Sequence, residues 1–289
     1  MPEFIINKLC IIGVGSMGGS LARALRKNNS VESIVGYGRN PERLIKAKDL
    51  GVVDEITSIL GDAIQDADII VLATPLGAMQ EILIALKDIV SSTSVITDVG
   101  SSKKFVIDAA KNAFGKVPVN FVPAHPIAGT EKSGVEAAKA DLFEQRRVIL
   151  TPQANTNASA VKTIRSMWQA CGANVVEMQV EHHDEVLAAT SHLPHMLAYS
   201  LVDTLARMDD QQEIFEYAAG GFRDFTRIAS SDPQMWHDIC VANREQLVNM
   251  LHAFNDDLQR LTKAVEQADS EYLKDTFTRA KNARDKFCE

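Results

Sequence analysis

The stretch "KLCIIGVGSMGGSLARALRK", Lys8–Lys27, decides the fold. Its first part, Leu9–Ile12, is a short apolar run rich in branched side chains, which is typical of a strand buried on both faces of a parallel sheet. A G-x-G-x-x-G motif follows, formed by Gly13, Gly15 and Gly18. In a dinucleotide-binding fold such glycines allow a tight turn, close approach of the backbone to a pyrophosphate and close packing of the next helix.

The surroundings of the motif favour this interpretation over an ordinary glycine-rich turn. Apolar residues recur at helical spacing over residues 16–27. A second apolar run, "SIVGY", ends about 20 residues after the motif, as the dinucleotide fold requires. The helix would begin at Ser16 and Met17 with its N-terminus facing the phosphates. We therefore predict that these two residues bind the cofactor together with the three glycines.

The rest of the first half alternates strand patterns with helix patterns. The runs "DADIIVLATP", "TSVITDVGSS", "VNFVPAHP" and "RRVILTP" are typical of strands, whereas "LGAMQEILIALKDIV" and "KKFVIDAAKNAF" are typical of helices. This order predicts a doubly wound, Rossmann-type α/β domain. Because ligands of such sheets bind beyond the carboxyl ends of the strands, we expect three pairs of residues to converge on one crevice: Thr74-Pro75, Gly100-Ser101 and His125-Pro126.

The second half of the chain has a different character. After about Met178 the β signal fades, and long amphipathic helix patterns such as "PQMWHDICVANREQLVNMLHAFNDDLQRLTKAV" replace it. We predict a nucleotide-binding domain over residues 1–178 and an all-helical domain over residues 179–289. Helices of this length often pair across a dimer axis, so a homodimer is expected.

The composition excludes several classes of function. The 289 residues carry a formal net charge of −8, and the basic residues are spread out, which argues against binding to nucleic acid or to an anionic membrane. No C-x-x-C pair occurs, so neither a zinc site nor a disulfide framework is indicated by Cys10, Cys171, Cys240 and Cys288. The sequence has no signal-peptide pattern and no run of about 18 apolar residues. We expect a cytoplasmic protein without a membrane span.

Five segments together indicate a family. They are "GVGSMGGSLA", "DVGSSK", "HPIAGTEKSG", "TSHLPH" and "GGFRDFTRIASSDPQMW". In order and spacing the chain resembles the prephenate and arogenate (cyclohexadienyl) dehydrogenases of tyrosine biosynthesis, from the first strand to at least Trp236. The resemblance implies oxidative decarboxylation of prephenate or arogenate, with hydride transfer to NAD+ or NADP+.

The resemblance implies that His125 is the base near the substrate hydroxyl. A neutral histidine suits this role because its ordinary pKa of ~6.5 lies near working pH. The alternative is that His125 merely caps a loop. Ser101 matches the serine that lies near the nicotinamide and this histidine. It is also a candidate N-cap of the following helix, either instead of that role or in addition to it. No metal is expected, because the nicotinamide already serves as the electron sink.

The resemblance also implies a set of substrate contacts. Arg227 matches the arginine that binds a substrate carboxylate, since a guanidinium can form two hydrogen bonds with it. The alternative is a solvated surface residue. His195 is the expected substrate contact and His192 the more structural histidine. Trp236 is a pocket wall, a dimer contact or a plain core residue, and the remaining predicted substrate contacts are Gly220 and Thr130.

Two charged pairs lie near the predicted substrate contacts in the sequence, and the first has two alternative roles. Glu131 and Lys132 form either an exposed pair worth ~0–1 kcal/mol, or Glu131 pairs with Arg227 across the domain gap and gates access to the substrate. Arg223 and Asp224 are expected to be a supporting pair.

The end of the second predicted strand bears on the choice of cofactor. A fold that prefers NAD usually has Asp or Glu there, whose carboxylate binds the ribose hydroxyls and repels a 2′-phosphate. This chain has Gly38 in that place, followed by Arg39. We predict that NADP is accepted and preferred over NAD. The alternative is that Gly38 is a turn residue, Arg39 points to solvent and NAD is used through backbone contacts.

Two other functions compete with this interpretation. A β-hydroxyacid or 6-phosphogluconate type dehydrogenase also joins a glycine-rich nucleotide domain to a helical one, but uses a central lysine for which no matching motif is evident. A nucleotide-sensing protein without turnover would have lost the base, yet His125 and Ser101 are present.

Overall fold

The computed structural model describes residues 4–129 and 132–288. The chain forms two compact units, Met1–Arg244 and Glu245–Glu289. The last described strand ends at Glu177, close to the predicted domain boundary after residue 178. That boundary stays a prediction.

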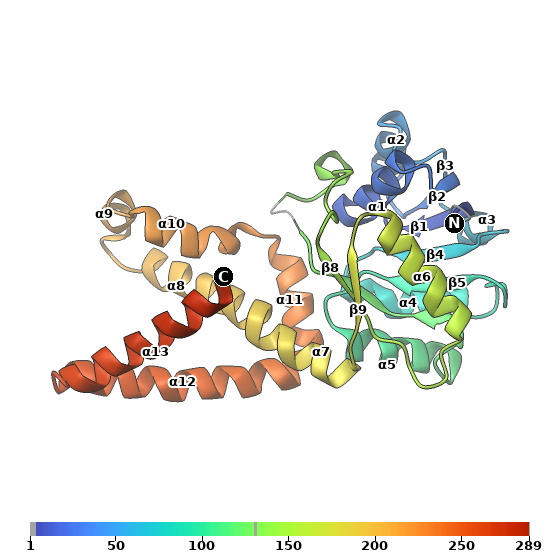
Figure 1. Ribbon diagram of the computed structural model, residues 1–289. Helices are drawn as coiled ribbons and strands as arrows, with labels where there is room; N and C mark the ends of the chain where they lie inside the picture. Colours follow the sequence, from blue (N-terminus) through green and yellow to red (C-terminus); the bar gives the residue numbers. More distant parts are fainter. Residues whose placement is uncertain (1–3, 130–131, 289) are drawn as a thin grey trace. The chain divides into compact units, whose positions relative to one another are not determined.

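The first unit is built on a six-stranded sheet with the strand order β3-β2-β1-β4-β5-β6 (Figure 1). Every pair of neighbouring strands in it is parallel. Its strands are β1 (Ile6–Ile12), β2 (Val31–Tyr37), β3 (Glu55–Thr57), β4 (Ile69–Leu72), β5 (Val95–Asp98) and β6 (Phe121–Val122). The order reverses between β1 and β4, which is where dinucleotides bind in doubly wound folds. The predicted fold class is confirmed.

Helices cover both faces of this sheet because β1 is apolar on both sides. Leu9 and Ile11 pack in one core cluster, whereas Cys10 and Ile12 pack in the other. Helices α1 (Ser16–Lys27), α2 (Pro41–Asp49) and α6 (Ala158–Ala170) contribute to the first cluster. The second cluster receives α3 (Leu60–Ile64), α4 (Leu76–Leu86) and α5 (Lys103–Phe114), and the last two lie side by side (Figure 1).

The run "VNFVPAHP" is not one strand, in contrast to the prediction. It is divided at Pro123 into β6 and β7 (Ala124–Pro126), because a proline cannot donate the hydrogen bond that would continue a ladder. β7 belongs to a second sheet, in which it pairs antiparallel with β8 (Arg147–Leu150), and β8 pairs parallel with β9 (Asn174–Glu177). His125 therefore lies in this small sheet, where it pairs with Ile149.

Among the described residues, helices alone follow β9, as predicted. Up to residue 242 they are α7 (Val180–Leu187), the π-helical turn η2 (Ala188–His192), α8 (Leu193–Ala206), α9 (Gln211–Glu216), α10 (Gly220–Thr226), the short 3-10 turn η3 (Arg227–Ser230) and α11 (Pro233–Ala242). The π-helical turn η2 lies just before Pro194, where a proline interrupts the regular helical hydrogen bonds.

The long helical pattern after Pro233 is divided at Asn243. α11 ends there, and α12 (Arg244–Glu266) and α13 (Ser270–Cys288) follow. The second compact unit consists of α12 from residue 245 onward and α13. No helix among the described residues is long and apolar enough to span a membrane.

Candidate active site

The turn between β1 and α1 requires glycine at two of its three motif positions. Gly13 has φ of +95°, and a Cβ added there would lie 2.8 Å from the carbonyl oxygen of Ala73. A Cβ at Gly18 would lie 2.6 Å from the carbonyl oxygen of Gly13. A Cβ at Gly15 would meet nothing within 4 Å. The open space at Gly15, at the N-terminus of α1, fits the pyrophosphate of a dinucleotide.

The residues after β4 contact this turn. The methyl group of Thr74 would lie 2.8 Å from a Cβ at Gly13, so the two strand ends are close. The Thr74 hydroxyl is buried and has no hydrogen-bond partner among the described residues, which makes it available to a ligand. Pro75 is the N-cap of α4, and Ser16 and Met17 begin α1. The Thr74 hydroxyl and the open space at Gly15 together fit a bound dinucleotide cofactor.

The residues after β2 lie at the same edge of the sheet. The carbonyl of Tyr37 accepts a 2.9 Å hydrogen bond from the amide of Gly13. Gly38 does not have a positive φ, and a Cβ there would make an ordinary contact of 3.4 Å with Leu44. The backbone therefore does not require glycine at this position. Arg39 follows and is exposed.

A buried ion pair lies at the end of β5. Nζ of Lys103 is 2.5 Å from Oδ2 of Asp98, and both side chains are fully buried. Asp98 also accepts hydrogen bonds from the amides of Gly100 (2.7 Å) and Ala124 (3.1 Å). Lys103 in turn donates to the carbonyl of Ala124 (2.6 Å). Burial lowers the pKa of Lys103, although Asp98 favours its charged form. The pair fixes the backbone directly before His125.

His125 is itself nearly buried, with 8% of its surface exposed. Its Nδ1 lies 2.9 Å from Nε2 of His183, and the two rings meet edge to face. Burial holds the pKa of His125 well below its usual range, and the nearby His183 and Lys103 lower it further. A neutral imidazole at this place can accept a proton, as a general base must.

The loop that holds Ser101 leads into a carboxylate from α7. Ser102 is the N-cap of α5, so the alternative role of Ser101 as N-cap is wrong. The side chain of Ser102 donates to Asp184 (3.1 Å), which also accepts hydrogen bonds from the amides of Lys103 (2.8 Å) and Lys104 (3.0 Å). The carboxylate of Asp184 thus caps α5 from a distant part of the sequence.

The two histidines of "TSHLPH" have different surroundings. His192 is buried, and its Nδ1 lies 3.1 Å from the side-chain nitrogen Nδ2 of Asn243. His195 is partly exposed and stacks on Trp236, with ring centroids 3.6 Å apart. Burial lowers the pKa of both histidines. The partly exposed His195 is thus the one of the two that a substrate could contact.

Trp236 is a core residue, which is one of its predicted roles. It is 8% exposed and packs in the same core cluster as α4 and α5. Its Nε1 is buried and has no hydrogen-bond partner among the described residues. The ring therefore joins α11 to the nucleotide-binding part and supports His195 at the same time.

Arg227 and Gly220, two other predicted substrate contacts, lie among the helices that follow β9. Arg227 begins η3 and is exposed, and Gly220 begins α10 and is exposed. Thr130 and Glu131 lie outside the described residues. The gate between Glu131 and Arg227 therefore stays a prediction.

Several buried polar residues of the site were not singled out from the sequence. They are Asp98, Lys103, His183, Asp184 and Asn243. The segment "DVGSSK" contains the first two and "EHHDEV" the next two, but a polar residue in a local pattern does not reveal whether a distant partner will bury it. Among the described residues, no group of His, Cys, Asp and Glu could hold a metal ion.

Comparison with known families gives two matches. The model described as "Prephenate dehydrogenase, nucleotide-binding domain" matches residues 21–177. The model described as "Prephenate dehydrogenase, dimerization domain" matches residues 179–279. Together they span most of the chain.

Individual proteins agree with these matches. The chain is 36% identical to a cyclohexadienyl dehydrogenase of Zymomonas mobilis, over 97% of this chain and 96% of the relative. It is 36% identical to a prephenate dehydrogenase of Bacillus subtilis, over 96% of this chain and 76% of the relative. The crystal structure of prephenate dehydrogenase from Aquifex aeolicus, in complex with hydroxyphenyl propionate and NAD+, is 39% identical and has a TM-score of 0.89, covering 96% of this chain and 97% of that one.

Proposed function

The chain belongs to the prephenate dehydrogenase family, and on this premise we propose that it oxidises and decarboxylates prephenate or arogenate with NAD+ or NADP+. The single observation that carries the proposal for this chain is the buried, neutral His125 beside the Lys103–Asp98 pair. Such a histidine can act as a general base at neutral pH.

The chemistry of the reaction explains why a base is needed. Hydride leaves the ring carbon that bears the hydroxyl, and the ring carboxylate is lost as carbon dioxide, so that the ring becomes aromatic. The nicotinamide accepts the hydride when it is bound. As the hydroxyl oxygen gains carbonyl character its proton becomes acidic, and we propose that Nε2 of His125 takes it up. Ser101, which directly precedes the N-cap of α5, is proposed to hydrogen-bond near the same oxygen.

Binding of the substrate requires positive charge, because prephenate carries two carboxylates. We assign one of them to the guanidinium of Arg227, which can form two parallel hydrogen bonds. His195, supported by its stacking on Trp236, is the proposed second contact. Gly220, Thr130 and Glu131 complete the proposed substrate site.

The preference between the two nicotinamide cofactors is proposed from Gly38 and Arg39. No carboxylate side chain stands at position 38 to repel a 2′-phosphate, and the conformation of Gly38 does not itself explain the glycine. A guanidinium directly after it offers charge-assisted hydrogen bonds to a phosphate. NADP is therefore the proposed preferred cofactor.

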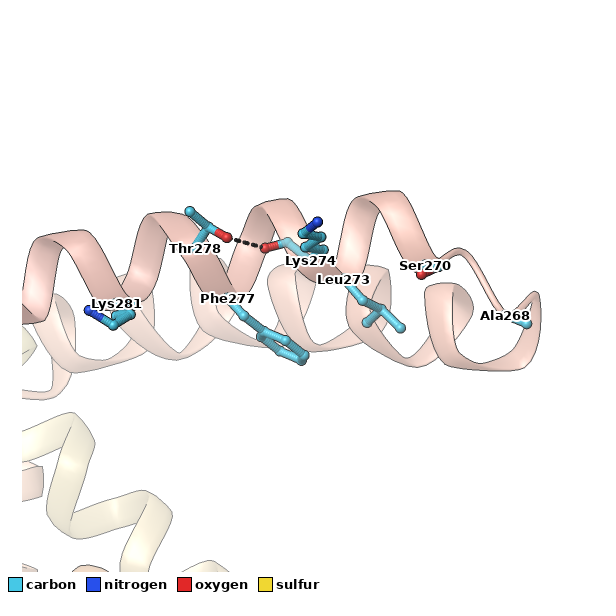
Figure 2. Close-up of a pocket in the computed structure, with 7 residues that line it drawn as sticks. All are labelled: Ala268, Ser270, Leu273, Lys274, Phe277, Thr278 and Lys281. Carbon is cyan, nitrogen blue, oxygen red and sulfur yellow. Dashed lines mark hydrogen bonds between the residues drawn. The ribbon is translucent and has the colours of Figure 1, made fainter.

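The assembly proposed for the enzyme is a homodimer that forms through its last helices. The matching family model for this region is described as a dimerization domain. Large apolar side chains are exposed here, among them Val265 (65%) and Phe277 (60%). Figure 2 shows Leu273 and Phe277 pointing to the same side of α13, in a shallow hollow near the turn between α12 and α13. A second copy of the chain would cover this face. The proposed location of the protein in the cell is the cytoplasm.

Steady-state assays with both substrates and both cofactors test the function. Prephenate should give 4-hydroxyphenylpyruvate and arogenate should give tyrosine, each with one reduced nicotinamide per carbon dioxide. Turnover of a simple 3-hydroxy acid without turnover of either cyclohexadiene would favour the β-hydroxyacid dehydrogenase alternative. Cofactor binding without turnover of any of these substrates would favour a sensing protein.

A further inference from the structure

Asp184, His183 and His125 form one continuous line of hydrogen bonds inside the first unit. Nδ1 of His183 is 2.7 Å from Oδ1 of Asp184, and Nε2 of His183 is 2.9 Å from Nδ1 of His125. We propose that Asp184 and His183 are positioning residues that hold His125 in the tautomer with its proton on Nδ1, which leaves the lone pair of Nε2 for the substrate. The use of that lone pair as a base rests on the proposed function.

The carboxyl group of Asp184 is subject to opposing effects on its pKa. Burial would raise the pKa of its carboxyl, but the hydrogen bonds from His183 and from the amides of Lys103 and Lys104 outweigh burial and lower it. The side chain of Ser102 donates to the same carboxylate. Asp184 is therefore ionised at neutral pH, and an ionised carboxylate can accept hydrogen bonds but cannot donate them.

The tautomer of His183 follows from the charge of Asp184. Its partner Asp184 cannot donate, so Nδ1 of His183 must be the donor across the 2.7 Å contact. Burial lowers the pKa of His183 despite the carboxylate, so the ring is neutral and carries a single N–H. Its Nε2 therefore has a lone pair that faces His125.

The tautomer of His125 follows from that of His183. Across the 2.9 Å contact, the lone pair on Nε2 of His183 can accept a hydrogen bond, so Nδ1 of His125 must donate it. The ring of His125 is neutral as well, because burial lowers its pKa. A neutral imidazole with the proton on Nδ1 has its basic lone pair on Nε2.

The charges around His183 support this arrangement. Asp184 comes from its own helix, Lys103 from α5, Asp98 from β5, His125 from β7 and His192 from η2. Lys103 and Asp98 form an ion pair with each other, so their opposite charges offset. Asp184 is thus the anion that can stabilise His125 after it has taken a proton, through the intervening ring. This arrangement follows the logic of a carboxylate that orients a catalytic histidine.

The tautomer can be measured directly in the whole protein without substrate or cofactor. In wild-type protein with nitrogen-15 histidine, long-range proton–nitrogen correlation spectra should show both His125 and His183 protonated at Nδ1. The signals of His125 are identified by their loss in His125→Asn. A wild-type His125 protonated at Nε2 would overturn the proposal without any variant of the two positioning residues.

The substitution Asp184→Asn tests the line of hydrogen bonds at its carboxylate end. Asp184→Asn can donate to Nδ1 of His183, so His183 should carry its proton on Nε2 and His125 should change to the Nε2 tautomer. We expect kcat to fall by about 10²–10⁴-fold with KM changed less than about threefold, as for a histidine forced into the wrong tautomer. Retention of the wild-type tautomer and kcat in a folded Asp184→Asn protein would refute the proposal.

Two variants of His183 keep or remove the acceptor of the hydrogen bond from Nδ1 of His125. His183→Gln places an amide oxygen near the position of Nε2, whereas His183→Phe removes the acceptor but fills the space. If His183 positions His125, His183→Gln should retain at least about tenfold more kcat than His183→Phe at equal cofactor affinity. Equal kcat values for the two variants would leave His183 with a packing role. The proton–nitrogen spectra require no turnover. They therefore decide the tautomer of His125 even if neither prephenate nor arogenate is a substrate.

Discussion

The side-chain amide of Asn243 donates a hydrogen bond to Nδ1 of His192 across 3.1 Å. Its second hydrogen is directed to the main-chain carbonyl of Asp184, at 2.8 Å. Because Nδ1 of His192 has to accept, protonation of that nitrogen would remove the hydrogen bond. Burial also disfavours the protonated form of His192 and lowers its pKa to about 4. Stability should therefore depend on pH through this residue.

The free energy of unfolding should decrease as the pH falls from about 6.5 towards 4. In this range the unfolded chain binds a proton at position 192 and the native protein does not, so acid favours the unfolded state. Between pH 7 and pH 5 the loss from His192 is roughly 2 kcal/mol, and it is absent above the ordinary histidine pKa. Urea unfolding at both pH values measures it.

His192→Gln should reduce this pH dependence, while His182→Gln should leave it unchanged. The side chain of His182 is 61% exposed, which makes it the matched control. His125 and His183 act in the same direction, because burial lowers the pKa of each. An unchanged pH dependence in a folded His192→Gln protein would show that another group is responsible.

His125→Asn should lower kcat by a factor of about 10²–10⁴, the usual contribution of a positioned general base. An asparagine can retain a hydrogen bond in the site but cannot take up a proton. Folding and cofactor affinity should remain close to wild type, which circular dichroism and a cofactor titration would check. A nearly unchanged kcat would mean that another group is the base.

Arg227→Ala should raise KM for prephenate and leave KM for the cofactor unchanged. The lost guanidinium leaves a substrate carboxylate without its charged partner, at a cost of about 1.5–3 kcal/mol. Arg207→Ala is the control, because this exposed arginine pairs with Asp203 and has no proposed role in substrate binding. Loss of cofactor affinity with an unchanged prephenate KM would place Arg227 at the nucleotide site instead.

Lys103→Met should destabilise the protein by about 3–5 kcal/mol, because it leaves the buried carboxylate of Asp98 without its counter-ion. Lys27→Met breaks the surface pair with Glu144, which is about half exposed on both sides, and should cost no more than about 1 kcal/mol. Chemical unfolding of both variants gives the comparison. A similarly small loss of unfolding free energy in both variants would show that another group compensates the charge of Asp98.

The sequence allowed the glycine turn and its strand and helix to be predicted because their signals are local. β1 ends at Ile12 and α1 runs over Ser16–Lys27, and both features follow from neighbouring residues. The second sheet was missed because the division at Pro123 depends on where β7 finds a partner, and that partner, β8, lies more than twenty residues away in the sequence.

The buried polar residues around His125 were predicted only in part, because their contacts join distant parts of the sequence. His125 was found through its motif, whereas the residues that determine its proton were not. Asp184 caps α5 from about eighty residues away, and His183 joins it to His125. No periodic pattern marks such long-range pairs, since each of these polar residues also suits an exposed surface.

A carboxylate introduced directly after β2 should change the preference between NADP and NAD. Gly38→Asp should shift the ratio of kcat/KM for NADP to that for NAD by at least about tenfold towards NAD, because the carboxylate repels the 2′-phosphate and accepts hydrogen bonds from the ribose. The substitution is compatible with the backbone, since Gly38 has no positive φ and a Cβ there would lie 3.4 Å from Leu44.

Two further variants separate charge from shape at this site. Gly38→Asn has nearly the same size without the charge, so it should shift the ratio much less than Gly38→Asp. Arg39→Ala should reduce the preference for NADP and leave turnover with NAD unchanged, because a guanidinium that binds the phosphate has no role with NAD. The ratio is measured for all four proteins at one fixed salt concentration, since phosphate contacts weaken with salt. A wild-type protein that prefers NAD by tenfold or more would show that Arg39 does not bind a 2′-phosphate, whatever the variants do.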